Sequence, residues 1–172
     1  MNNRTIVASL LIGTVALGAC KPKAPDTLPP EPVETTSSTQ TTTTTAPTGA
    51  ELGTQRHFVD AVNGQNVIYF DTDRYNIDSA DAVALQSQAQ YLMRYPSIRV
   101  TVEGHADERG TREYNLALGE RRANAAKNYL VGLGIDASRV RTVSYGKERP
   151  VALGSNESAW AQNRRAVTVV IE

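Results

Sequence analysis

The sequence predicts an α/β (α+β) sandwich of two layers, in which helices cover one face of a mixed four-stranded sheet. Short apolar runs rich in β-branched residues alternate with segments of helical periodicity, in the order β-α-β-α-β-(α)-β. Apolar residues make up 40% of the 172 residues, a share that a globular domain can use for a core. We therefore expect one folded domain, at residues 57–172.

The first strand and the first long helix are predicted in the first half of this domain. Residues 66–70 form a short apolar run that reads as a strand, with the turn residues Asn63 and Gly64 before it. Asp78 or Ser79 offers an N-cap for the helix, which Tyr95-Pro96 ends. The apolar residues between them recur at helical spacing: Ala82, Leu85, Ala89 and Leu92.

The second half supplies three more strands and two more helices. Residues 98–103 alternate apolar and polar side chains, as a half-buried strand does. After a glycine-bounded loop, a long helix is predicted at residues 113–133, closed by Gly134. We expect the remaining elements at residues 139–145 (strand), 157–162 (short helix) and 166–171 (strand).

Residues 1–19 have the pattern of a signal peptide. Arg4 supplies a positive charge, and the apolar run at residues 6–17 is shorter than the about 20 residues that span a bilayer. Leu17-Gly18-Ala19-Cys20 follows and resembles the lipobox of bacterial lipoproteins, whose cysteine receives lipid. The alternative is a general signal peptide beside an unrelated cysteine. We expect lipidation at Cys20, with palmitate among the acyl chains.

Lipidation would attach the chain to a membrane without a second apolar segment, because each buried acyl CH₂ contributes about 0.8 kcal/mol. Cys20 is the only cysteine, so no intramolecular disulfide can form. In enteric-type sorting an Asp after the cysteine favours the inner membrane, and here Lys21 follows it. The resemblance to lipoproteins therefore implies the outer membrane, with the domain facing the periplasm.

The segment between the lipidated cysteine and the domain, residues 20–56, is rich in Pro and Thr and includes a run of threonines at 41–45. Such a segment has too few large apolar residues to offset the entropy cost of ordering. We expect a disordered tether.

The loop at residues 104–110 (GHADERG) and the helix after it hold the candidate site. Loops at the carboxyl ends of strands commonly carry ligand-binding residues, and this loop is rich in polar side chains. Helical phase, taken from Leu118, predicts a buried stripe through Ala125, Tyr129 and Leu133. Arg122 falls within this stripe, about 40° from Leu118, whereas the adjacent Arg121 lies toward its edge.

A buried arginine requires an anion, because an unpaired charge in a low dielectric costs several kcal/mol. Asp107 on the loop is one candidate partner, and a ligand carboxylate is another. A purely structural ion pair between Asp107 and Arg122 is the alternative to a binding site. Asn115 lies on the same side of the helix and adds an amide to the predicted pocket.

Three separated stretches carry a family resemblance: GHADERGTREYNLALGERRANAAKNYL, VSYGKERP and NRRAVTVVIE. Together they resemble the OmpA-like peptidoglycan-binding domain over about residues 66–172. The resemblance implies the OmpA C-terminal-like fold and recognition of meso-diaminopimelate in the peptide stem of peptidoglycan. Asp107 would pair with the ammonium of that residue, and Arg122 would take a carboxylate.

Further residues follow from the same resemblance, which also implies protein partners. The remaining pocket residues that it implies are Tyr69, Phe70, Asp71, Thr111, Asn115 and Leu118. Arg112 stands where related lipoproteins usually have proline, so the start of the helix departs from the family pattern. Lipoproteins of this family work in the Tol-Pal system, so the resemblance implies TolB and TolA as partners, and a role in outer-membrane invagination at cell division. The alternative function is that of a protein-interaction module, which mainly binds these Tol partners.

Other function classes are disfavoured. Eighteen basic and eighteen acidic residues balance, so the chain lacks the basic excess typical of nucleic-acid binding. His57 and His105 have no metal-ligand spacing and no nucleophile motif beside them, and Asp107 with Glu108 is a poor catalytic pair. We expect no enzyme activity, metal or cofactor, a structural role for His105, and a solvated edge at Arg164-Arg165.

Overall fold

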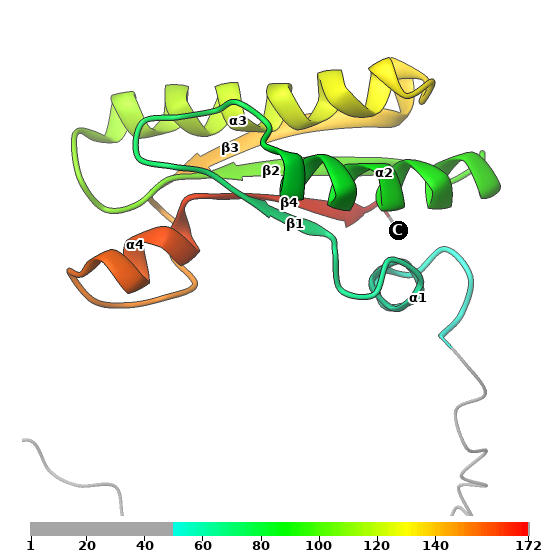
Figure 1. The fold of residues 1–172 in the computed structure, drawn as a ribbon, viewed down its shortest axis with the longest axis horizontal. Helices are drawn as coiled ribbons and strands as arrows, with labels where there is room; N and C mark the ends of the chain where they lie inside the picture. Colours follow the sequence, from blue (N-terminus) through cyan, green and yellow to red (C-terminus); the bar gives the residue numbers. More distant parts are fainter. Residues whose placement is uncertain (1–49, 172) are drawn as a thin grey trace, which may run out of the picture. The chain divides into compact units, whose positions relative to one another are not determined.

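The computed structural model describes residues 50–171. The predicted signal peptide, Cys20 and residues 20–49 of the predicted tether lie outside the described residues. The elements are α1 (Gln55–Ala61), β1 (Val67–Tyr69), α2 (Ser79–Arg94), β2 (Val100–His105), α3 (Arg112–Gly132), the 3-10 turn η1 (Ala137–Arg139), β3 (Val140–Gly146), α4 (Glu157–Asn163) and β4 (Arg165–Val170) (Figure 1).

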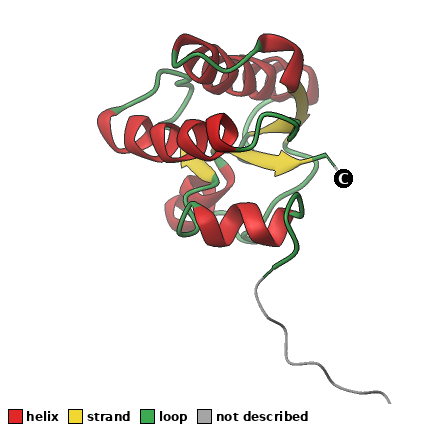
Figure 2. Cartoon of the chain, turned by 90° about the vertical axis from the view of Figure 1, so that its right-hand side faces the viewer, coloured by secondary structure: helices red, strands yellow, loops and turns green. Residues whose placement is uncertain are grey.

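The four strands form one mixed sheet in the order β1-β4-β2-β3. Strand β4 pairs antiparallel with both β1 and β2, whereas β2 and β3 run parallel. The long helices α2 and α3 cover one face of this sheet, and Figure 2 shows these layers from the side. The predicted fold class is therefore confirmed, and each predicted strand and helix lies within a few residues of its expected bounds.

The core fills the space between the sheet and the two long helices. Val100 and Val102 of β2 are completely buried, as are Leu85 of α2 and Leu130 of α3. Asp78 caps α2, because its side chain accepts a hydrogen bond from the Asp81 amide. The apolar side chains that alternate along β2 and those that recur at helical spacing along α2 thus pack against each other in one apolar layer.

Helix α1 is not predicted by the sequence. It begins after Thr54, whose side chain accepts a hydrogen bond from the His57 amide, and it buries Phe58 and Val62 in the core. The Phe58 ring packs edge-on against Tyr91 of α2, with 5.0 Å between ring centroids. One apolar pair four residues apart is too short a pattern to show helical periodicity, which explains the omission.

Helix α3 approaches β2 more closely than side chains usually allow. A Cβ on Gly104 of β2 would lie 1.8 Å from the carbonyl oxygen of Gly119 in α3, so only glycine fits at this crossing. The contact turns α3 so that its small residues face the sheet, and Ala123 and Ala126 are buried. The predicted stripe is therefore wrong in its phase, since Ala125, Tyr129 and Leu133 are only half-buried.

None of the helices within residues 50–171 is long and apolar enough to cross a membrane.

Candidate functional site

Two neighbouring cavities lie where the loop after β1, the loop after β2 and the start of α3 meet. The first, here called the inner cavity, has a volume of about 240 Å³ and is lined by Thr72, Asp73, Asp107, Arg109, Gly110, Tyr114, Asn115, Leu118 and Arg122. The second, here called the outer cavity, has a volume of about 330 Å³ and is lined by Tyr69, Phe70, Asp71, Asn76, Asp78, Ala161, Gln162 and Arg164. The residues predicted as one pocket are thus divided between two.

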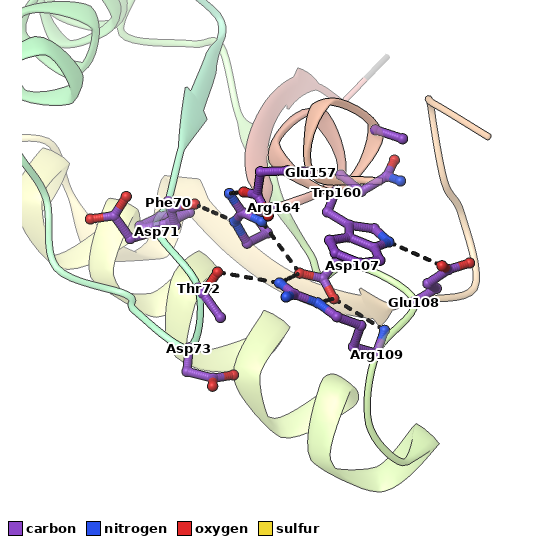
Figure 3. Close-up of polar contacts among 12 residues, drawn as sticks. Phe70, Asp71, Thr72, Asp73, Asp107, Glu108, Arg109, Glu157, Trp160 and Arg164 are labelled. Carbon is purple, nitrogen blue, oxygen red and sulfur yellow. Dashed lines mark hydrogen bonds and ion pairs between the residues drawn. The ribbon is translucent and has the colours of Figure 1, made fainter. Parts of the chain in front are cut away.

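Asp107 is a buried carboxylate held by two arginines (Figure 3). Arg109 Nη2 lies 2.7 Å from Asp107 Oδ2 and its Nε donates to Oδ1 at 3.0 Å, so the contact is bidentate. Arg164 Nη1 lies 3.5 Å from Oδ2. Burial by itself would raise the pKa of Asp107, but the hydrogen bonds and charge of Arg109, with the charge of Arg164, hold that pKa below its ordinary value.

Arg122 is completely buried and is held by the backbone. Its guanidinium donates to the carbonyl oxygens of Arg74, His105 and Asp71, at 2.9, 2.8 and 3.1 Å. Burial lowers the pKa of Arg122 to about 10, and the charge of Asp107 works against that fall. The side chain therefore remains protonated at neutral pH. The predicted inward orientation of Arg122 is confirmed, and Arg121 is exposed as expected.

The structure does not show a direct ion pair between Asp107 and Arg122. Among the described residues, Arg122 has no carboxylate within salt-bridge distance, and Asp107 pairs with Arg109 and Arg164 instead. The alternative of a purely structural pair is therefore wrong. A guanidinium has more N–H donors than three carbonyls use, and Arg122 lines the inner cavity. Because its side chain is completely buried, a ligand in that cavity reaches the remaining donors only after a covering side chain moves aside.

Asn115 and Thr111 fix the loop against α3. The Asn115 side chain donates to the carbonyl oxygens of Arg109 and Thr111, at 2.7 and 3.1 Å, and is 2% exposed. Thr111 caps α3 by accepting from the Tyr114 amide and lines neither cavity. Leu118 lines the inner cavity. Arg112 begins the helix from an exposed position and pairs with Glu148 at 3.2 Å, so the missing proline leaves the helix start intact.

Tyr69, Phe70 and Asp71 line the outer cavity rather than the inner one. Figure 3 shows the Asp71 side chain pointing away from Asp107, and only its carbonyl oxygen meets Arg122. Phe70 packs beneath the guanidinium of Arg122, with 5.2 Å between the arginine Cζ and the ring centroid. Phe70 and Asp71 therefore hold Arg122 of the inner cavity in place, whereas Tyr69 belongs to the outer cavity alone.

The expected solvated edge at Arg164-Arg165 is wrong. Arg164 is 5% exposed and donates to the Phe70 carbonyl at 2.9 Å and to Glu157 Oε1 at 2.6 Å. Arg165 is 6% exposed, and burial lowers its pKa. The pairing of β4 with β1 brings the start of β4 beside the end of β1, which puts Arg164 within reach of Asp107. No pattern within residues 163–166 alone shows this.

Arg109 and Trp160 are the other site residues that the sequence does not single out. The Arg109 guanidinium stacks over the Trp160 ring at 4.2 Å, and Trp160 Nε1 donates to Glu108 at 3.0 Å (Figure 3). Helix α4 thus packs against the loop at residues 104–110, on the side opposite α3. For Arg109 the available signal was its place in the loop, directly after the acidic residues Asp107 and Glu108.

His105 contributes its backbone to the site and its ring to the opposite face of the sheet. The ring is 2% exposed, and both of its nitrogens lack hydrogen-bond partners within the described part of the chain. Burial lowers the pKa of His105 to about 4, and the charges of Arg165 and Arg149 act in the same direction. This neutral ring supports the expected structural role. Residues 50–171 contain no cluster of His, Cys, Asp or Glu able to hold a metal ion.

Comparison with known proteins places this site in a family. The model of the OmpA family matches residues 69–164, which include both cavities. This chain belongs to the OmpA family. The resemblance predicted from its motifs is thus confirmed, and the loop with Asp107 and the helix with Arg122 lie within the matched range.

Several relatives in the OmpA family share one name. A peptidoglycan-associated lipoprotein of Agrobacterium fabrum is 57% identical over 121 residues, which cover 70% of this chain and 67% of that protein. The protein of that name from Haemophilus influenzae is 52% identical over 102 residues, covering 59% of this chain and 67% of that protein.

Solved structures agree on the fold. The crystal structure of the peptidoglycan-associated lipoprotein from Burkholderia pseudomallei matches with a TM-score of 0.63 and 44% identity, covering 66% of this chain and 99% of that one. The C-terminal domain of Helicobacter pylori MotB matches with a TM-score of 0.58 at 18% identity, covering 62% of this chain and 84% of that one, which shows the fold alone.

Proposed function

We propose that this chain is an outer-membrane lipoprotein whose OmpA-family domain binds peptidoglycan non-covalently through the inner cavity. The observation that carries the proposal is the pair of opposite charges in that cavity. A buried, protonated Arg122 has no acidic partner in contact among residues 50–171, and the ionised Asp107 lines the same cavity. The names of the relatives support the choice of peptidoglycan as ligand.

The ligand group that suits this cavity carries both charges. The free end of a diaminopimelate side chain bears an ammonium and a carboxylate on one carbon. The carboxylate would take the remaining N–H donors of Arg122, and the ammonium would approach Asp107. Arg109 already occupies both oxygens of Asp107, so the ammonium must share or displace that guanidinium. Arg109 is able to move because its side chain is 38% exposed.

The proposal extends to residues 1–56 and to the protein's partners. A signal peptide at residues 1–19, lipidation with palmitate at Cys20 and a tether from there to the start of α1 would hold the domain in the periplasm, at a distance from the outer membrane. Because α1 begins at Gln55, the tether ends slightly before the predicted bound at residue 56. Membership of the Tol-Pal system, with TolB and TolA as partners and a role in cell division, completes the proposed function. Labelling cells with radioactive palmitate should mark the wild-type chain and spare Cys20→Ala, and equal labelling would contradict the anchor.

Sedimentation with purified sacculi tests the binding function. Asp107→Asn keeps the shape of the side chain and removes its charge, so we expect most of the bound protein to be lost. Asp60→Asn is the matched control. Within residues 50–171 the Asp60 side chain pairs only with the exposed Arg56, and both lie on helix α1, at the far end of the domain from α4 (Figure 1). Equal sedimentation of the wild type and both variants would refute the proposed site.

A further inference from the structure

The outer cavity shares a wall with the inner cavity. Arg164 lines the outer cavity and reaches Asp107 of the inner one at 3.5 Å. Asp71 lines the outer cavity, its carbonyl accepts a hydrogen bond from Arg122, and the next residue, Thr72, lines the inner cavity. The outer cavity is therefore within reach of a ligand that is larger than one amino acid and occupies the inner cavity.

The charges of the outer cavity disfavour a second anionic group. Arg164 is already engaged by Glu157 at 2.6 Å, by Asp107 at 3.5 Å and by the Phe70 carbonyl at 2.9 Å. The other ionisable groups that line the cavity include two carboxylates, Asp71 and Asp78. A carboxylate placed here would meet two like charges and a cation that is already neutralised. The neighbouring acidic residues of a peptide stem are therefore a poor match.

The uncommitted groups of this cavity suit an uncharged ligand with many hydroxyls. The side chains of Asp71 and Asn76 make no hydrogen bond within residues 50–171, and Gln162 donates only to the Ser158 carbonyl, which leaves its amide oxygen free. The Tyr69 ring is 52% exposed beside them. Carboxylates and amides accept from and donate to hydroxyl and acetamido groups, and an aromatic face packs on the C–H surface of a sugar ring.

We propose that the outer cavity binds an N-acetylated, uncharged sugar of the glycan strand, joined through the two intervening stem residues to the diaminopimelate held in the inner cavity. This inference rests on the proposed function, because it takes the peptide stem as the ligand of Asp107 and Arg122. The domain then binds the glycan and the stem together, with the sugar in the outer cavity and the stem in the inner one. Asn76 and Gln162 supply the amides of this sugar site.

The test compares two ligands by calorimetry on the full-length chain in detergent. One ligand is the stem tripeptide that ends in diaminopimelate, and the other is the same tripeptide attached to its N-acetylated disaccharide. We expect the wild type to bind the second about tenfold more tightly, the equivalent of two net hydrogen bonds. The double variant Asn76→Ala/Gln162→Ala should lose this difference and keep the affinity for the free tripeptide.

A matched double variant, Gln86→Ala/Asn128→Ala, removes two exposed amides that line neither cavity and should retain the tenfold difference. Equal affinity of the wild type for both ligands would overturn the sugar site and leave the proposed function standing. An equal loss for both ligands in Asn76→Ala/Gln162→Ala would also overturn it, because the cavity would then hold the peptide. Failure of the wild type to bind either ligand would refute the proposed function and the sugar site together.

Discussion

At the scale of single residues, Arg122 combines the proposed binding role with a structural one. Its guanidinium joins two backbone segments, the loop after β1 at Asp71 and Arg74 and the end of β2 at His105. Each of the three carbonyl oxygens would lose a hydrogen bond if the side chain were removed. Binding data for variants of Arg122 therefore require a stability measurement beside them, and so do those for Asp107→Asn, which keeps the shape of the side chain but weakens its ion pairs with Arg109 and the buried Arg164.

We predict that Arg122→Leu lowers the free energy of unfolding by roughly 2 to 4 kcal/mol, because three buried or half-buried carbonyls each lose a hydrogen bond. The adjacent Arg121→Leu should stay within about 0.5 kcal/mol of the wild type, since Arg121 is exposed. Urea unfolding of both variants measures the difference. Equal stability of the two would show that the three hydrogen bonds contribute little.

His105 should make stability depend on pH. Its pKa in the folded state is about 4, below the ordinary value of 6.5, so the unfolded chain takes up a proton first as the pH falls. The contribution of the neutral ring is complete above pH 6.5 and is lost between that pH and about 4. We expect a loss of about 2 kcal/mol between pH 7 and pH 5, absent in His105→Phe. If the free energy of unfolding of His105→Phe depended on pH as it does in the wild type, the dependence would belong to other groups.

At the scale of elements, the crossing of α3 over β2 sets the position of the site. Gly104 and Gly119 let the two backbones meet, and Asp107 and Arg122 each follow three residues after one of these glycines. A side chain at the crossing would push the helix away from the strand. The geometry of the inner cavity thus depends on two residues that do not line it.

We predict that Gly119→Ala destabilises the fold by more than about 2 kcal/mol, because its Cβ would lie 2.3 Å from Ser144 Oγ and 2.9 Å from the Gly104 carbonyl oxygen. Gly132→Ala, in the same helix, meets no atom within 4 Å and should be neutral or stabilising by up to about 1 kcal/mol. Thermal unfolding separates the two. Similar melting temperatures would mean that the helix shifts without cost.

The sequence predicts the elements well and their contacts less well. Strands and long helices follow from apolar periodicity, and Arg122 is correctly turned inward by the same reasoning. The phase of the α3 stripe is wrong because burial at the crossing is set by Gly119, Ala123 and Ala126, whose small side chains weigh little in an apolar pattern. Arg164 is misplaced because its burial depends on a strand pairing across most of the domain.

At the scale of the whole molecule, the proposed binding surface lies at one end of the domain and is built from several elements. Loops after β1 and β2, the start of α3 and helix α4 all contribute to the two cavities. The family resemblance implies some residues of each cavity, such as Tyr69 and Asp107, but not the division into two cavities. That division follows from Arg164 and Asp107, which meet only in the folded chain.

The central claim is that the inner cavity recognises an ammonium and a carboxylate together. The most direct measurement is the affinity of the wild-type chain for two stem tripeptides, one ending in meso-diaminopimelate and the other in lysine, which lacks the second carboxylate. We predict at least about tenfold tighter binding of the diaminopimelate peptide, because a charge-assisted hydrogen bond to Arg122 contributes about 1.5 kcal/mol or more. Equal affinities would contradict the claim.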